Sequence, residues 1–197
     1  KGQISTLKCI SKEEEKELLV HFNSNNVSYS FGTTVLDLIK ENVTKQPDST
    51  AIVFDNRKFT YLELDQLSNQ LASHLRNVSG VSSQDFVAIM LERSEMLIVS
   101  ILAVLKTGAA FVPIDPSYPS ERIKYILEDV NAKVLITESD NLFNFDYYTG
   151  ELFAVDIQLH SLETSKEPLE TVVNAEDHAY VIYTSGSTGF PKGCKIK

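Results

Sequence analysis

A strand, a buried helix and a second strand follow one another in the middle of the chain, and this order restricts the fold most. Residues 86–91 are a continuous apolar run of strand length, as in a sheet covered on both faces. Ser94 begins a helix that is apolar on nearly every side, and Gly108 supplies the left-handed residue that ends it. Strand residues 110–112 follow at once. The sequence therefore predicts an α/β fold with a largely parallel sheet.

A hydroxyl residue followed three positions later by Glu marks the start of two other helices. Ser11 with Glu14 begins a short helix, and Thr60 with Glu63 begins a long one. The apolar stripe expected on the short helix comprises Leu18, Leu19 and Phe22. The buried stripe expected on the long helix comprises Leu64, Leu67, Leu71 and Leu75. Both helices are thus predicted from local sequence alone.

Shorter elements complete the predicted fold. We expect a helix over residues 34–46, ended by Pro47, and a helix that has Pro119 in its first turn. The expected strands are residues 51–54 and 58–59, which flank a turn at 55–57, and residues 133–137 and 152–155. From Glu138 to Asp177 the periodicity is otherwise weak.

The most specific chemistry lies near the C-terminus, where the apolar run 180–184 leads into a loop rich in glycine and hydroxyl residues. Glycines allow close backbone approach and let successive N–H groups face an anion. Hydroxyl groups and a lysine, Lys192, add donors and a positive charge suited to phosphate oxygens. We therefore expect a nucleoside triphosphate to bind here, with Lys192 as the catalytic residue. The predicted binding residues are Thr184, Ser185, Gly186, Ser187, Thr188, Gly189, Lys192 and Gly193.

Two other interpretations of this loop compete with phosphate binding. A Walker P-loop requires a glycine directly before the lysine and Ser or Thr directly after it. Pro191 and Gly193 occupy these positions, so the spacing excludes a P-loop. A plain Ser/Gly linker does not ordinarily follow directly from an apolar strand or end in Pro-Lys-Gly. A phosphate-binding loop remains the preferred interpretation.

Composition narrows the class of protein. The chain of 197 residues is 43% hydrophobic and 23% charged, which is typical of a folded globular protein, and its net charge is −9. This negative charge argues against binding to nucleic acid or to an anionic membrane surface. The two cysteines, Cys9 and Cys194, fit a reducing compartment, and the sequence shows no signal peptide or membrane span. We expect a cytoplasmic protein.

Other polar residues have simpler explanations than catalysis. Asp115 fits a turn, and Lys106 fits the last turn of a helix, where a cation is favourable. The four histidines have no acid or cysteine placed to form a catalytic triad or a metal site. Of these, only His178, which precedes the strand at 180–184, is a candidate for a functional role.

Three segments together resemble the adenylate-forming superfamily, most closely the adenylation domains of nonribosomal peptide synthetases. Residues 179–193 match its phosphate-binding signature, and residues 59–64 match its first core motif. Residues 105–115, continued to 119, match the second core motif, except that Thr107 replaces the usual Ala and Phe111 the common Tyr. Residues 10–23 are similar to the linker that joins a condensation domain to an adenylation domain.

This resemblance implies that the protein activates an amino acid. ATP and the amino acid would give an aminoacyl-adenylate and pyrophosphate, and the acyl group would pass to the phosphopantetheine of a peptidyl carrier domain. Residues 1–30 would be the linker from a neighbouring condensation domain, and residues 31–197 the N-terminal portion of the adenylation core, truncated after the phosphate loop. The ligands for Mg²⁺, the adenine contacts and the amino-acid pocket are expected outside this stretch, so we expect the 197-residue chain alone to be inactive.

Two alternatives remain open. One is an acyl- or aryl-acid CoA ligase of the same superfamily, which shares the phosphate loop but usually lacks the form found at residues 112–116. The other is a non-catalytic fragment that serves only in folding or docking. The sequence does not identify the amino acid, because the pocket residues are expected beyond Lys197.

Overall fold

The structure, a computed structural model, describes residues 10–26, 32–170, 173–185 and 190–197. The chain divides into two compact units, Lys1–Phe31 and Gly32–Lys197. In the first unit, α1 (Lys12–Lys16) continues into a π-helical turn, η2 (Glu17–His21). The predicted capping box of α1 is confirmed, because Ser11 and Glu14 each accept a hydrogen bond from the other's backbone N–H. The predicted apolar stripe of this short helix is exposed, as seen for Leu18, Leu19 and Phe22.

A six-stranded sheet forms the centre of the second unit, in the order β6-β5-β3-β4-β7-β8. Its strands are β3 (Phe86–Ile89), β4 (Ala110–Pro113), β5 (Val134–Thr137), β6 (Glu151–Ala154), β7 (Tyr180–Thr184) and β8 (Lys192–Ile196). All neighbouring pairs are parallel except β7 and β8. The predicted largely parallel sheet is confirmed. The sequence pattern does not predict β8, because this exposed edge strand has no buried face to impose an alternation.

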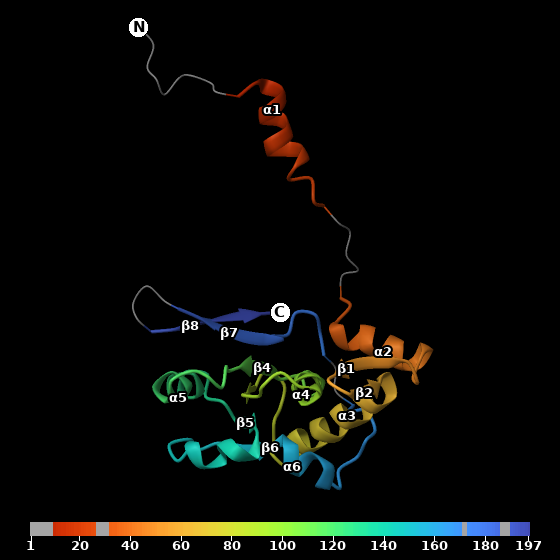
Figure 1. The fold of residues 1–197 in the computed structure, drawn as a ribbon, viewed down its shortest axis with the longest axis vertical. Helices are drawn as coiled ribbons and strands as arrows, with labels where there is room; N and C mark the ends of the chain where they lie inside the picture. The colour runs from red at the N-terminus through yellow and green to blue at the C-terminus, as the bar shows by residue number, and fades with distance from the viewer. Residues whose placement is uncertain (1–9, 27–31, 171–172, 186–189) are drawn as a thin grey trace. The chain divides into compact units, whose positions relative to one another are not determined.

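Helices cover both faces of the sheet. The longer ones are α2 (Val35–Lys45), α3 (Tyr61–Asn77), α4 (Glu95–Lys106) and α5 (Ser120–Asp129). Short turns follow, namely η3 (Ser139–Asn144), α6 (Val155–Gln158) and η4 (Leu159–Ser161). Figure 1 shows α5 on one side of the strands and α3 and α4 on the other. Each side has its own apolar core, one built on α3 and α4 and the other on α5 and the strands beneath it.

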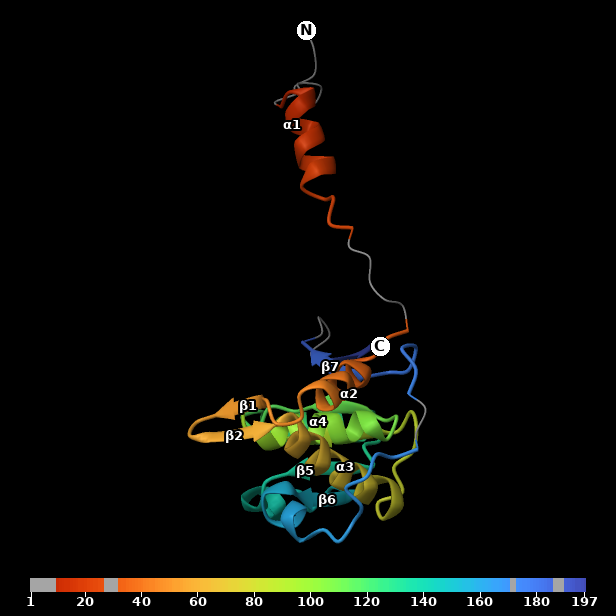
Figure 2. The same ribbon diagram turned by 90° about the vertical axis from the view of Figure 1, so that its right-hand side faces the viewer.

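Two antiparallel strands, β1 (Thr50–Phe54) and β2 (Arg57–Thr60), form a hairpin that projects from the second unit in Figure 2. The predicted turn at 55–57 is one residue shorter in the structure, because Arg57 already pairs with Phe54. Asp55 adopts a positive φ of 52°, which a short polar side chain tolerates in a tight turn. The hairpin ends directly at the start of α3.

The boundaries of the helices follow their predicted caps closely. Thr34 and Thr60 each form a capping box, and Gly108 has the predicted left-handed conformation with φ 78°. Pro119 is one residue outside its predicted place, because its extended ψ of 143° makes it the N-cap of α5 instead of a first-turn residue.

Candidate functional site

The candidate site begins where β7 ends. β7 lies between β4, its parallel neighbour, and β8, its antiparallel neighbour. Its side chains alternate, so that Val181 and Tyr183 are buried while Thr184 is exposed at the carboxyl end. In parallel sheets, ligands bind beyond the carboxyl ends of the strands. The hydroxyl-rich segment predicted to bind phosphate therefore begins at a favourable edge of the sheet.

The structure describes only part of the predicted binding set. Gly186, Ser187, Thr188 and Gly189 lie outside the described residues. Thr184 and Ser185 stand before this gap, and Lys192 and Gly193 stand after it. The register of the hairpin pairs Thr184 with Lys192 and Tyr183 with Gly193. Because directly paired residues share a face of the sheet, Thr184 and Lys192 lie side by side at the mouth of the hairpin.

The ammonium group of Lys192 is available to a ligand. The residue is exposed, and its side chain forms no hydrogen bond or ion pair with any residue that the structure describes. By contrast, Lys197 at the other end of β8 pairs with Glu176 at 2.7 Å. A lysine next to the phosphate-binding segment and without a protein acceptor suits a polyanionic ligand.

Gly193 has a spatial reason to be glycine. A Cβ atom at this position would lie 3.0 Å from Cγ1 of Val181 and 3.1 Å from Cζ of Tyr183. Such distances are shorter than ordinary van der Waals contact. The backbone at Gly193 therefore packs directly against the Tyr183 ring. This packing is a reason for glycine that is separate from the ligand contact predicted from the sequence.

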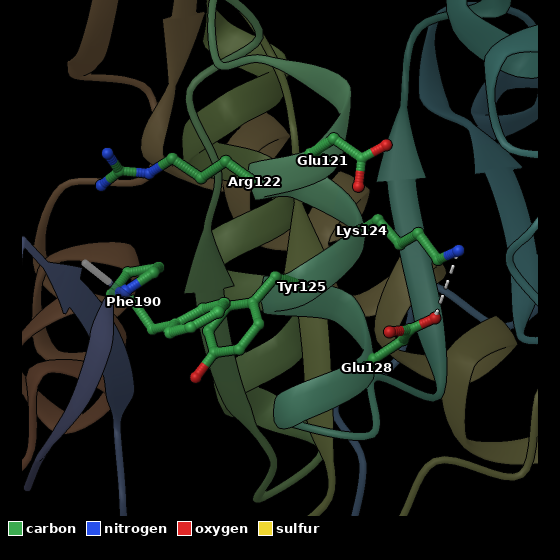
Figure 3. Close-up of a pocket in the computed structure, with 7 residues that line it drawn as sticks. Glu121, Arg122, Lys124, Tyr125, Glu128 and Phe190 are labelled. Carbon is green, nitrogen blue, oxygen red and sulfur yellow. Dashed lines mark ion pairs between the residues drawn. The ribbon is translucent and has the colours of Figure 1, made fainter. Parts of the chain in front are cut away.

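Residues on both sides of the gap at 186–189 contact α5. The Tyr183 hydroxyl donates a hydrogen bond to Oδ2 of Asp129 at 2.5 Å, and the Phe190 ring lies 5.5 Å from the Tyr125 ring. Figure 3 shows the Tyr125 and Phe190 side chains next to each other beside a cavity of about 410 Å³. Sequence reasoning missed these contacts. Tyr183 and Phe190 lie within the matched signature, but their partners on α5, Asp129 and Tyr125, are more than 50 positions away and belong to no recognised motif.

The two residues that sequence analysis interpreted as structural are confirmed in that role. Asp115 accepts hydrogen bonds from the backbone N–H and hydroxyl of Ser117 at 2.8 and 2.6 Å, which is a local turn. These bonds lower the pKa of the Asp115 carboxyl group. Lys106 is held by an ion pair with Asp65 at 2.7 Å and by two further side-chain oxygens. The ammonium group of Lys106 is therefore occupied by the protein itself.

An acidic group lies at the carboxyl edge of the sheet, just after β5. The pKa of Glu138 is raised by burial and by the nearby negative charges of Asp156, Glu92 and Asp140. Within the residues that the structure describes, no three His, Cys, Asp or Glu side chains are grouped so as to hold a metal ion. The described residues therefore offer no ready ligand set for Mg²⁺.

A second cavity, of about 450 Å³, opens at the opposite edge of the sheet. It lies around Tyr180 at the amino end of β7, and its walls are mainly apolar. His178 lines this cavity, and its Nδ1 atom is buried with no hydrogen-bond partner in the part of the chain that is described. The residue singled out from the sequence thus lies at the edge remote from the phosphate-binding segment.

Comparisons with known proteins agree on one family. The sequence profile of the family described as AMP-binding enzyme matches residues 39–197. Gramicidin S synthase 2 of Brevibacillus brevis is 41% identical over 99% of this chain, which spans 4% of the length of that relative. Tyrocidine synthase 3 of Brevibacillus parabrevis is 40% identical over 98% of the chain, which spans 3% of it.

Solved structures are similar to the same region. The N-terminal subdomain of Klebsiella oxytoca NpsA, in complex with 3-hydroxybenzoyl-AMSN, has a TM-score of 0.73 and 33% identity; the match covers 82% of this chain and 40% of that one. In the part of the chain that the structure describes, no helix has both the length and the apolar character needed to cross a membrane.

Proposed function

Because this chain belongs to the AMP-binding enzyme family, we propose that it supplies the phosphate-binding wall of an adenylation domain that activates an amino acid with ATP. The resemblance to peptide-synthetase adenylation domains, first drawn from three motifs, agrees with the similarity to two peptide synthases. The single observation that carries the proposal is the pairing, at the carboxyl end of β7, of Thr184 with Lys192, whose side chain has no partner among the residues that the structure describes. The activity of the longer protein is part of the proposal.

The proposed reaction is a displacement at phosphorus. A carboxylate oxygen of the amino acid forms a bond to the α-phosphorus of ATP, and the bond from this phosphorus to the bridging oxygen breaks. Pyrophosphate then leaves with the bonding electrons and its added negative charge. The enzyme's task is positioning and charge neutralisation. Lys192 and the donors of the predicted set would neutralise the pyrophosphate as it departs.

The roles of the predicted residues follow from their chemistry. The hydroxyl groups of Thr184, Ser185, Ser187 and Thr188 would donate to phosphate oxygens, and Gly186 and Gly189 would allow close backbone approach. A magnesium ion would supply further positive charge on the phosphates. Because the described residues hold no cluster suited to a metal, its ligands are expected elsewhere in the protein.

The proposed partners belong to a modular enzyme. We place residues 1–30 as a linker from a condensation domain and residues 31–197 as the start of the adenylation core. The exposed apolar side chains after α1 are compatible with a segment that lies against another part of such an enzyme. The activated acyl group would pass to the phosphopantetheine thiol of a carrier domain, and the enzyme would act in the cytoplasm.

A second candidate is activation of an aryl acid. The NpsA subdomain, 33% identical, was solved with a 3-hydroxybenzoyl ligand. The residues that would bind the acid substrate are expected beyond Lys197, so an experiment must distinguish an aryl acid from an amino acid.

The test is ATP–pyrophosphate exchange by the full-length protein with a panel of amino acids, hydroxy acids, aryl acids and fatty acids. We expect exchange that depends on one or a few amino acids. Exchange with aryl acids alone would move the protein to the second candidate. A lack of exchange with every acid would contradict both proposals.

A further inference from the structure

We infer that contacts with helix α5 hold both stems of the phosphate-binding segment, the first stem being Tyr183 at the end of β7 and the second being Phe190 just before β8. We infer further that Tyr183, whose ring packs against Gly193, positions Thr184 and Lys192 for the reaction.

This inference rests on the proposed function, since it concerns the same site. It assigns a positioning role to Tyr183, for which the sequence analysis proposed none, and to two residues of α5, Tyr125 and Asp129, that lie outside the matched motifs. The stem before the segment and the stem after it are fastened by different contacts.

The first stem is fastened by a hydrogen bond. Tyr183 is 7% exposed, and its hydroxyl donates to Oδ2 of Asp129, the last residue of α5. Burial and the hydrogen bond to Asp129 raise the pKa of the Tyr183 hydroxyl, so it stays protonated and remains a donor at physiological pH.

The second strand of the hairpin makes room for this ring. A Cβ atom at position 193 would lie 3.1 Å from Cζ and 3.3 Å from the hydroxyl oxygen of Tyr183. The backbone of Gly193 shows no positive φ that would itself require glycine. Glycine is therefore needed at this position for space, because any side chain there would push the Tyr183 ring away from Asp129.

The second stem is fastened by aromatic contact. The Phe190 ring lies 5.5 Å from the Tyr125 ring, and the Tyr125 ring also meets Tyr183 edge-on, at 6.5 Å and 88°. These separations are those of favourable aromatic pairs. In Figure 3 the Tyr125 side chain extends from α5 beside the Phe190 ring. One residue of α5 thus contacts both stems.

The consequence for catalysis is geometric. Tyr183 directly precedes Thr184, and Gly193 directly follows Lys192. A shift of the Tyr183 ring would move the hydroxyl and the ammonium group together, away from the phosphates. Reactions that depend on alignment lose rate steeply when the aligned groups move by a fraction of an ångström to one ångström. None of the fastening residues needs to touch the substrate.

The test uses four single substitutions in the full-length protein. Y183F and D129A remove the hydrogen bond, whereas D129N keeps an oxygen that accepts it. Y180F is the matched control, because Tyr180 lies on the same strand but packs against Phe111 instead of α5. We expect Y183F and D129A each to lower kcat/KM for ATP in pyrophosphate exchange by about tenfold, which is within the range of one hydrogen bond.

Two kinetic details separate positioning from a general loss of structure. The KM for the amino acid should not change in Y183F or D129A, and the double variant should lose no more than either single one. D129N and Y180F should stay within about twofold of the wild type. Equal rates in all four variants, or additive losses in the double variant, would overturn the inference.

Substitution of Gly193 independently tests the packing of the Tyr183 ring against the backbone at this position. G193A should lower kcat/KM for ATP in the wild-type background but add little in a Y183A background, because the ring it displaces is then absent. An equal loss in both backgrounds would show that Gly193 acts without Tyr183 and would contradict the inference.

Hydrogen exchange tests the fastening without any reliance on activity. Amides within residues 183–193 of the full-length protein should exchange faster in D129A, and at the wild-type rate in D129N. If the wild type activates no acid, the proposed function fails, and faster exchange in D129A still supports the fastening. Unchanged exchange in D129A would overturn the fastening, whatever the activity. Faster exchange with unchanged kinetics would overturn the positioning role.

Discussion

Two lysines in motif-bearing segments differ in what surrounds their ammonium groups. Lys106, at the end of α4, is 14% exposed, and its Nζ atom lies 2.7 Å from an oxygen of each of Asp65, Ser68 and Asn69. Lys192, at the start of β8, is exposed and has no such partner in the described part of the chain. An ammonium group has three donors, and those of Lys106 are taken by the protein itself. The difference teaches that only the second lysine is free to meet a ligand.

The regions around these lysines differ in the same way. α3 buries several polar residues that bind distant backbone: Asn69 donates to the carbonyl of Lys166 at 3.0 Å, and Gln70 donates to that of Leu162 at 2.6 Å. These two buried side chains of α3 are thus satisfied by hydrogen bonds within the protein. The β7–β8 hairpin instead ends in groups that face outward. One region stabilises the fold, and the other is left available for chemistry.

Removing the buried ammonium should have the largest effect. We expect K106A to lower the free energy of unfolding by about 3 kcal/mol, because it leaves the Asp65 carboxylate without its partner. Urea unfolding of the domain that contains this chain would measure the loss. K124A is the control, since Lys124 makes only a surface pair with Glu128 at 4.0 Å and a contact over the Tyr147 ring at 5.5 Å, and it should cost less than about 0.5 kcal/mol. A similar small cost for K106A would refute the comparison.

Removing the exposed ammonium should leave the fold intact and slow the reaction. We expect K192A to lower kcat in pyrophosphate exchange by about 100-fold, which corresponds to about 2.7 kcal/mol of transition-state stabilisation. Its unfolding midpoint should match that of the wild type. K195A, a change on the same strand with the side chain over the Phe86 ring, is the control and should keep its rate. An unchanged exchange rate in K192A would remove Lys192 from the proposed mechanism.

A third charged contact tests whether the layer of α3 and α4 depends generally on paired charges. Glu95, at the start of α4, is 1% exposed, and Nη1 of Arg57 lies 2.5 Å from its Oε1. We expect R57A to cost about 1 to 2 kcal/mol, less than K106A, because the Arg57 side chain is largely exposed. Thermal unfolding would measure this, with K58A as the neighbouring control. If R57A matches K58A, the buried carboxylate does not depend on its partner.

The smallest effect is expected at the carboxyl edge, where like charges are left unrelieved. The pKa of Glu138 is raised in the folded protein by burial and by the carboxylates of Asp156, Glu92 and Asp140. The folded state therefore holds the proton more tightly than the unfolded state, and its contribution to stability is lost as pH rises through the raised pKa. E138Q should stabilise the protein at pH 7 by less than about 1 kcal/mol and have no advantage at pH 4. Unfolding between pH 4 and 8 would show this, and a gain that is larger at acid pH would contradict it.

Local features of the fold were predictable from sequence. Capping boxes at Ser11 and Thr60, the left-handed Gly108 and the apolar strand β3 all rest on residues within four positions of each other or on one continuous run. The general place of the site at the end of β7 followed from the same evidence. Family comparisons then agreed with the resemblance drawn from the motifs.

Other features could not be predicted. β8 has no periodic signal, and the polar face of α3 gave no indication of burial, because its partners lie more than 90 residues away in the chain. Ser68 and Asn69 would ordinarily be assigned to a solvated surface. A polar side chain is compatible with either water or a protein oxygen, and the sequence does not distinguish them.

The sequence by itself determined the longer helices, the parallel strands and the residue types of the predicted phosphate-binding segment, because each depends on neighbouring residues and on side-chain type. Only the tertiary structure decided which of the two lysines has its ammonium group bound by other residues and which strand pairs with β7 at Thr184. It also decided that a side chain at position 193 would collide with Tyr183. Lys106 meets Asp65 across 41 positions, and Tyr183 meets Asp129 across 54. Such contacts arise when the whole sheet and its helices pack together, and the spacing of residues along the chain does not encode them.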